Sequence, residues 1–126
     1  MYKNLTITSV LGGFAVILGA FGAHALKATL STEAMQSFET AVRYQFIHVL
    51  LLLFINTFKE FTLKQKNAIS FCVIVGILLF SGSIYAIHLL EVPAKSIWFV
   101  TPLGGVMLII GWSLMVFHFF KKVINQ

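Results

Sequence analysis

The sequence predicts an all-α integral membrane protein, a four-helix bundle with a short interfacial amphipathic helix between the first and second spans. Three runs, residues 5–26, 68–90 and 97–120, contain no Asp, Glu, Lys or Arg. A fourth charge-free run, residues 44–58, is shorter. About 20 apolar residues are needed to cross roughly 30 Å of hydrocarbon as a helix. Charged residues make up 10% of the chain, against about a quarter in soluble domains. The whole chain, residues 1–126, therefore reads as one membrane domain with four spans.

The first span, about residues 5–26, is rich in small side chains. Ala15, Gly19 and Ala23 recur at i, i+4 and i+8. Lipid offers no hydrophobic force between helices, so close backbone approach through small residues drives their packing. We therefore expect this helix to lie at the centre of the bundle. The glycines expected to serve the same packing role in the third and fourth spans are Gly82, Gly104 and Gly105.

Residues 27–43 form the one extended polar segment, and its part from about residue 31 to residue 43 leads into the second span, about residues 41–58. Its apolar positions follow i, i+3 and i+7 at Met35, Phe38 and Val42. Glu39 and Arg43 have the i, i+4 spacing of a helical ion pair. Ser31 or Thr32 suits an N-cap. This pattern predicts an amphipathic helix lying in the membrane interface and leading into the span.

The third and fourth spans, about residues 68–90 and 97–120, are separated by a short polar loop. Trp98 suits an interfacial anchor at the start of the fourth span. Thr101 and Pro102 resemble an N-cap followed by proline at the first helical position, where its missing N–H is harmless. Residues 59–67 form a short basic loop between the second and third spans.

The distribution of cations predicts the orientation. One side receives Lys3, Lys59, Lys64, Lys66, Lys121 and Lys122. The other side receives Lys27, Arg43 and Lys95. The positive-inside rule then places both termini in the cytoplasm of a cell-membrane protein. The net charge of +5 does not indicate a nucleic-acid partner, because the cations flank apolar spans, where they suit lipid headgroups.

Polar residues of the spans gather towards one side of the membrane. The candidate polar cluster comprises His24, Arg43, Tyr44, Gln45, His48, Tyr85, His88 and Thr101. Polar groups at this depth are costly in lipid, so we expect them to face inward or the outer boundary. One interpretation is interhelical hydrogen bonding with headgroup contact at the rim. A second is a role in proton handling or substrate binding, and a third is a metal or haem site built from His24, His48 and His88. No carboxylate lies in a span to support such a site, and no metal or cofactor is expected.

Four motifs in order carry a family resemblance. They are Gly19–His24, Thr40–Gln45 with His48, Ser81–Tyr85, and Thr101–Gly105 with Gly111 and Trp112. Over essentially its whole length the chain resembles the YgdD/YwdK family of small bacterial membrane proteins of unknown function. The resemblance implies four spans and no particular reaction. The motif positions it carries over are His24, Arg43, Tyr44, Gln45, His48, Tyr85, Thr101, Pro102, Gly104 and Gly105.

Three classes of function remain compatible with the sequence. The first is a non-enzymatic membrane protein that packs with itself, with lipid or with a larger complex. The alternative is a small oligomeric carrier or channel for a neutral or polar solute, although no acidic residue lies in a span to couple ions. The third is a haem- or metal-binding redox subunit. With no Asp in the chain and every Glu outside the charge-free runs, acid–base catalysis is hard to assemble, and we expect no enzyme.

Overall fold

The computed structural model describes residues 2–125, and its regular elements are all helical. The four long helices are α1 (Tyr2–His24), α2 (Thr32–Thr57), α3 (Leu63–Leu89) and α4 (Val100–Ile124). Two short 3₁₀ helices, η1 (Leu26–Ala28) and η2 (Ala94–Ser96), lie in the connections. Each long helix is apolar and long enough to cross a membrane. The all-α fold with four candidate spans is therefore confirmed.

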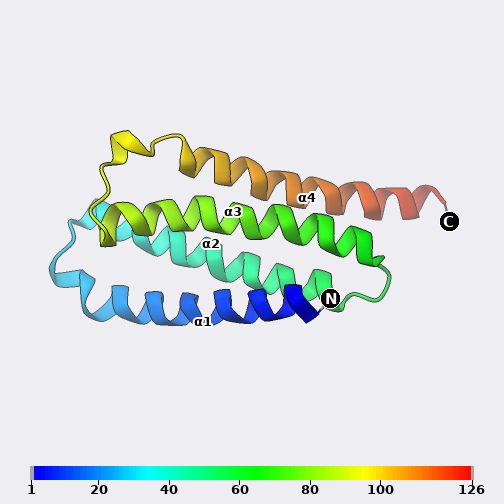
Figure 1. The fold of residues 1–126 in the computed structure, drawn as a ribbon, viewed down its shortest axis with the longest axis horizontal. Helices are drawn as coiled ribbons and strands as arrows, with labels where there is room; N and C mark the ends of the chain where they lie inside the picture. The colour runs from blue at the N-terminus through cyan, green and yellow to red at the C-terminus, as the bar shows by residue number, and fades with distance from the viewer. Residues whose placement is uncertain (1, 126) are drawn as a thin grey trace.

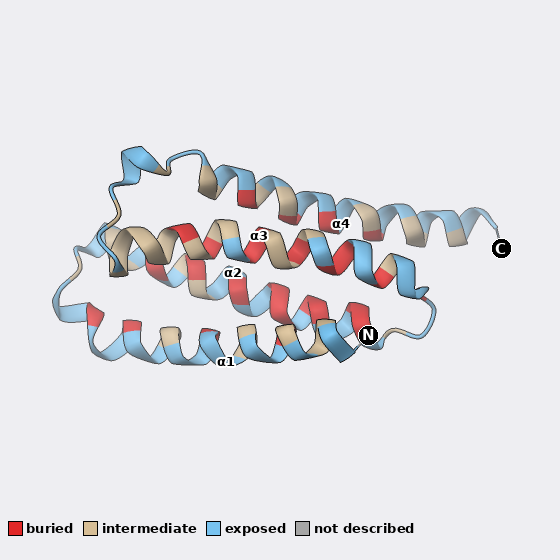
Figure 2. Cartoon of the chain, viewed as in Figure 1, coloured by how far each residue is buried: buried red, intermediate tan, exposed pale blue. Residues whose placement is uncertain are grey.

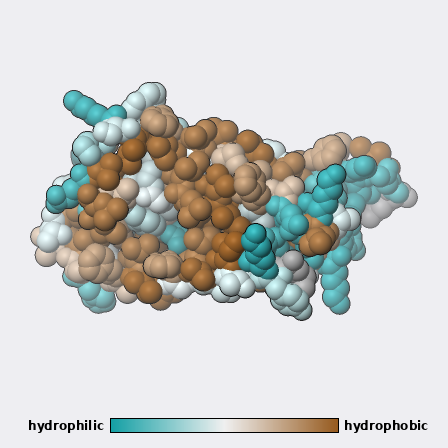
Figure 3. All heavy atoms as spheres, viewed as in Figure 1, coloured by the Kyte–Doolittle hydropathy of each residue, from teal (hydrophilic) through white to brown (hydrophobic). Residues whose placement is uncertain are grey.

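Successive helices run antiparallel and pack as neighbours, with α1 and α4 on opposite sides of the α2–α3 pair (Figure 1). We call the end of the bundle with the α1–α2 and α3–α4 connections the two-loop end. We call the opposite end, with both termini and the α2–α3 connection, the terminal end (Figure 1). Buried residues concentrate on α2 and α3 (Figure 2). The visible face is hydrophobic over its middle and more hydrophilic towards its ends (Figure 3), the distribution expected when hydrocarbon surrounds the helices.

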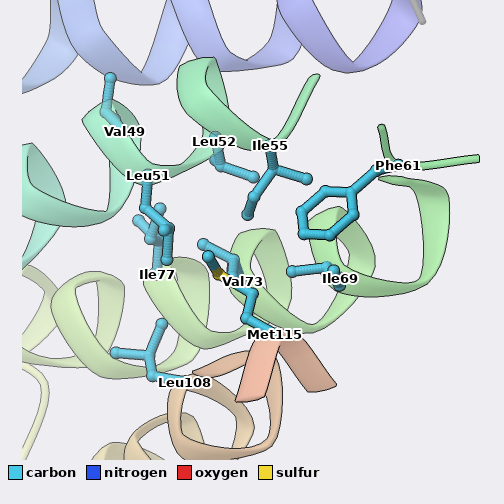
Figure 4. Close-up of a cluster of buried hydrophobic side chains, with 10 residues drawn as sticks. All are labelled: Val49, Leu51, Leu52, Ile55, Phe61, Ile69, Val73, Ile77, Leu108 and Met115. Carbon is cyan, nitrogen blue, oxygen red and sulfur yellow. The ribbon is translucent and has the colours of Figure 1, made fainter. Parts of the chain in front are cut away.

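The largest apolar cluster joins α2, α3 and α4 (Figure 4). Its buried members are Val49, Leu51, Leu52, Ile55, Phe61, Ile69, Val73, Ile77, Leu108 and Met115. None of these ten buried members comes from α1, so the central position expected for this helix is wrong. Its half-buried Leu11 packs against the cluster, and it otherwise packs on α2 mainly through small side chains. In lipid, such tight packing rather than expulsion of water holds the helices together.

The predicted interfacial amphipathic helix over residues 31–43 is wrong. These residues form the N-cap and first half of α2, one continuous 26-residue helix with a length of about 39 Å. Ser31 is the N-cap, and its Oγ accepts a hydrogen bond from the backbone N–H of Ala34 at 3.2 Å. The apolar face identified from the sequence is real, but it packs on α1: Phe38 is buried against Gly22. Helix packing and membrane-surface binding produce the same periodicity.

The fourth helix begins earlier than the Thr101–Pro102 pair suggests. Its N-cap is Phe99, which makes no side-chain capping bond, and Thr101 lies within the first turn. Proline is tolerated at Pro102 because the first-turn N–H groups have no helical acceptor. The Thr101 hydroxyl is instead hydrogen-bonded to Ser83 on α3.

The small-residue stripe of α1 contacts α2 through a different set of positions from the one predicted. Ala15 is fully buried, and a Cβ on Gly19 would stand 3.3 Å from a side chain of α2. Ala23 is exposed, and Gly22 takes its place, with a hypothetical Cβ 2.7 Å from the Phe38 ring. Steps of four residues turn by 400° and drift around the helix, whereas alternating steps of four and three keep to one face.

The α3–α4 contact depends on glycine at one predicted position but not at the others. A Cβ on Gly104 would collide with the backbone of Phe80, so α3 and α4 approach closely there. Gly105 would make an ordinary contact at 3.9 Å. The packing role predicted for Gly82 finds no support, because its Cβ position has no described neighbour within 4 Å apart from its own helix backbone and chain neighbours. The sequence interpretation left out two further close-approach glycines of this interface, Gly76 and Gly111.

Candidate functional site

Gln45 joins three helices near the middle of the protein. Its side chain on α2 is buried, with 3% exposed. Gln45 Nε2 donates to the backbone oxygen of Leu11 on α1 at 2.7 Å. The hydroxyl of Tyr85 on α3 donates to Gln45 Oε1, also at 2.7 Å. One amide therefore ties α1, α2 and α3 together through its two ends.

His48 connects α2 to α4. The indole N–H of Trp112 donates to His48 Nε2 at 3.2 Å, so Nε2 carries no proton. His48 Nδ1 lies 2.7 Å from the backbone oxygen of Tyr44 and is the ring nitrogen that donates. Both ring nitrogens of a neutral imidazole are thus used within the protein. We call Gln45, Tyr85, His48 and Trp112 the central network.

The position of the central network follows from helical periodicity. Gln45, His48, Leu52 and Asn56 occupy one stripe of α2, and all four are buried. Trp112 is the partner that sequence reasoning missed, because the sequence places it only in the fourth motif and not in the candidate polar cluster. An indole N–H at membrane depth needs an acceptor, and that requirement was the available signal.

The structure spreads the other predicted site residues apart. Tyr44 is 41% exposed, and its ring stacks on Phe80 with centroids 4.7 Å apart. His24 and Arg43 are exposed. Thr101 pairs with Ser83 and lies with the half-buried His88 in a hollow of about 540 Å³ between α2 and α3.

The three histidines of the metal or haem hypothesis do not converge. His24 ends α1 in an exposed position, His48 lies between α2 and α4, and His88 lines the hollow beside α2. Among residues 2–125, no three His, Cys, Asp or Glu side chains are grouped closely enough to hold a metal ion. The described residues therefore offer no set of three side-chain ligands for a metal ion, and they do not bring the three histidines to one site.

A second hydrogen-bonded group lies at the terminal end, and sequence reasoning did not find it. Asn4 Nδ2 donates to Asn56 Oδ1 at 3.1 Å and to Asn67 Oδ1 at 3.0 Å. Asn56 Nδ2 donates to Ser70 Oγ and to the Leu52 oxygen, both at 2.9 Å. We call Asn4, Asn56, Asn67 and Ser70 the asparagine network. Asn56 was visible as an amide in a charge-free run, but its partners lie far away in sequence.

Lys66 adjoins the asparagine network and is buried, with 7% exposed. Its Nζ donates to the backbone oxygen of Asn56 at 3.1 Å, in the last turn of α2. Carbonyls of a last turn lack helical donors, and a cation there is favourable with the helix dipole. Lys66 was counted above as a loop cation; in the structure it caps α2.

An ion pair fixes the end of α4 at the same side of the protein. Lys122 binds the Glu60 carboxylate in the α2–α3 connection. The hydrogen bond and positive charge of Lys122 lower the pKa of Glu60 from its usual value. Both side chains are substantially exposed, so this pair orients the helix end and contributes little stability.

Residues 18–105 match the family described as "Protein of unknown function (DUF423)". This match covers more than half of the 126 residues. The chain belongs to the DUF423 family. The family match contains Gln45, His48 and Tyr85, whereas Asn4 and Trp112 lie outside the matched range.

Relatives of this DUF423 chain are membrane proteins by name. A "UPF0382 membrane protein" of Haemophilus influenzae is 35% identical over 122 residues, covering 95% of each chain. One from Staphylococcus aureus is 38% identical over 107 residues, covering 85% of this chain and 86% of the relative. The "UPF0382 inner membrane protein YgdD" of Escherichia coli is 35% identical over 121 residues, covering 90% of this chain and 87% of YgdD. No solved structure matches significantly. The predicted resemblance and the multi-pass membrane class are confirmed.

Proposed function

We propose that this DUF423 protein is a non-enzymatic membrane protein that acts by holding lipid or another membrane protein against its lateral surface. The observation that carries the proposal is the state of its buried polar groups. Among residues 2–125, every buried side-chain nitrogen and oxygen has a hydrogen-bond partner. Catalysis and solute transport need polar groups that are free to meet a substrate. Here the central and asparagine networks use those groups to join helices.

The lateral surface supplies the binding features that the interior lacks. Between α1 and α3, an apolar hollow of about 370 Å³ runs past Phe14 and Gly82. A second hollow of about 480 Å³ lies between the same helices at the terminal end, with Lys3 and Asn67 in its lining. Apolar walls with a cation at one end suit a lipid chain and its headgroup.

The lipid or protein contact can be tested by filling the hollow. Gly82→Leu points into open space between α1 and α3, whereas Gly13→Leu adds the same side chain to an exposed position of α1. We expect purified wild-type protein to retain phospholipid or a membrane partner, measured by mass spectrometry. Gly82→Leu should reduce the retained amount, and Gly13→Leu should not. A wild-type preparation that retains neither lipid nor protein would refute the proposal.

The proposed orientation in the cell membrane places both termini in the cytoplasm. We leave two cations out of the original count, since Lys66 is buried against the last turn of α2 and Arg43 lies well inside α2. Of the remaining cations, Lys3, Lys59, Lys64, Lys121 and Lys122 flank the terminal end, and Lys27 and Lys95 flank the two-loop end. The bias still favours a cytoplasmic terminal end.

Reporter fusions test this orientation directly. A green fluorescent protein fused after the C-terminus should fluoresce in cells, and alkaline phosphatase fused at the same place should be inactive. The same two reporters inserted between Lys95 and Ile97 should give the opposite pattern. Active phosphatase at the C-terminus would show that the orientation is the opposite of the one proposed.

A further inference from the structure

A groove between α1 and α2, near the two-loop end, carries two charged side chains. Gly19 and Ala23 of α1 line it together with Phe38 of α2, and its volume is about 210 Å³. Glu39 and Arg43 complete the lining. The groove is therefore apolar where the two helices meet and charged along its α2 side.

Both charges lie in the first half of a helix that is long and apolar enough to cross a membrane. Glu39 and Arg43 lie about 10 Å and about 16 Å along α2 from Thr32. Both therefore lie on the two-loop side of the helix midpoint, in the half of α2 that faces the headgroups at that end. Charged side chains at this depth are costly unless they reach headgroups or a partner of opposite charge.

The two side chains are not joined to each other by a direct ion pair. Their i, i+4 spacing allows an ion pair, yet among residues 2–125 the ion pair formed is Lys122–Glu60. Neither Glu39 nor Arg43 side chain makes a hydrogen bond to another described residue, and both residues are exposed. A carboxylate and a guanidinium thus face the groove side by side, each able to bind an external group.

We propose that this groove binds a phospholipid whose headgroup holds a phosphate and a primary ammonium. Arg43 would bind the phosphate and Glu39 the ammonium, with the glycerol lying over Gly19 and Ala23. The two side chains lie in the same order of depth as the two headgroup charges. The phosphate of such a lipid lies deeper than its ammonium, and Arg43 lies about 6 Å further from the start of α2 than Glu39. Guanidinium groups are well matched to phosphate oxygens. This inference rests on the proposed function and names the ligand class.

Other occupants fit the charges less well. A trimethylammonium headgroup cannot donate hydrogen bonds to Glu39, and an anionic glycerol headgroup lacks the cation altogether. A second copy inserted the same way would be related by a two-fold axis along the membrane normal. That axis would place each charge level with the same charge of the other copy, which opposes association.

The test measures headgroup preference in the full-length protein. Detergent-solubilised protein is mixed with equal amounts of phosphatidylethanolamine, phosphatidylcholine and phosphatidylglycerol of identical acyl chains, and bound lipid is counted by native mass spectrometry. Wild type should bind phosphatidylethanolamine about fivefold over the other two, the factor that one partly screened ion pair supplies. Arg43→Gln and Glu39→Gln should each remove most of that preference.

Two matched sets separate this site from general effects of charge and shape. The double variant Glu39→Arg, Arg43→Glu keeps both charges but reverses their depth, and it should lose the preference. Glu91→Gln with Lys95→Gln removes an exposed pair of the same spacing in the α3–α4 connection, and the preference should persist. Ala23→Leu fills the groove and should abolish the preference, whereas Ala20→Leu, exposed on α1 outside the groove, should not.

The outcomes are distinct. Lipid retained without headgroup preference would overturn this inference and leave the proposed function standing, whereas no retained lipid or partner would end both. A preference that survives Arg43→Gln and Glu39→Gln would place the lipid elsewhere and refute the assignment. Dimers that disappear in those two variants would make this face an interface between copies instead. Circular dichroism and gel-filtration profiles of each variant verify its fold.

Discussion

The hydrogen bond between Tyr85 and Gln45 allows one buried contact to be removed with little change in shape. Tyr85→Phe deletes the hydroxyl that donates to Gln45 Oε1 at 2.7 Å. The amide oxygen is then left unpaired in a side chain that is 3% exposed. Such a group costs about 1–3 kcal/mol in the free energy of unfolding, and interhelical bonds in membranes average about 0.6 kcal/mol. We expect a loss of about 1 kcal/mol.

A double-mutant cycle isolates this contact from other effects of the substitutions. Gln45→Leu also removes the bond to Leu11, so it should cost more than Tyr85→Phe. The double variant should be more stable than the sum of the two losses predicts, by about 0.6–1.7 kcal/mol of coupling energy. Reversible unfolding in mixed micelles, followed by circular dichroism against the fraction of sodium dodecyl sulfate, measures all four proteins. A coupling energy of zero within error would refute the reasoning.

Three further perturbations follow from the geometry. Gly104→Ala places a Cβ against backbone and should reduce the free energy of unfolding by about 2 kcal/mol, whereas Gly105→Ala should change it by less than about 0.5 kcal/mol in the same assay. Lys66→Met removes the amine that caps α2 and should cost about 1 kcal/mol; an unchanged unfolding curve would argue against that cap. The pKa of Glu60 is lowered by Lys122, so this ion pair stabilises the folded protein at pH values above about 4.5, the pKa of Glu60 in the unfolded chain. The stabilisation is lost as the pH falls through the lower pKa that Glu60 has in the folded protein. Lys122→Met should raise the Glu60 pKa in a carbon-13 NMR titration, and an unmoved titration would show that the pair does not form.

The four spans were predictable because the absence of charge over about 20 residues has few explanations other than a bilayer. The start of α2 was not. Met35 and Phe38 lie on one helical face whether that face meets lipid headgroups or another helix. Only the position of α1, with Gly22 against Phe38, decides between the two.

The polar contacts were predictable by type and not by partner. Gln45, His48 and Asn56 stand out as polar residues in an apolar helix, and each is buried as their periodicity indicated. Their partners come from other helices, with Trp112 contributing to His48 and Asn4 to Asn56. Such pairings depend on helix register, which helical periodicity within one segment does not determine.

The central claim is that each long helix crosses the bilayer, with α2 continuous through residues 31–43. Spin labels report their depth in the membrane through their accessibility to oxygen and to a nickel chelate. They are attached to single cysteines introduced in a Cys72→Ala background at exposed α2 positions 36, 39, 43, 46, 50 and 54. A continuous crossing helix predicts that depth rises steadily from residue 36 through residues 39 and 43, reaches a maximum beyond residue 43 and falls again by residue 54. A constant shallow depth from residue 36 to residue 43, followed by an abrupt descent, would contradict it.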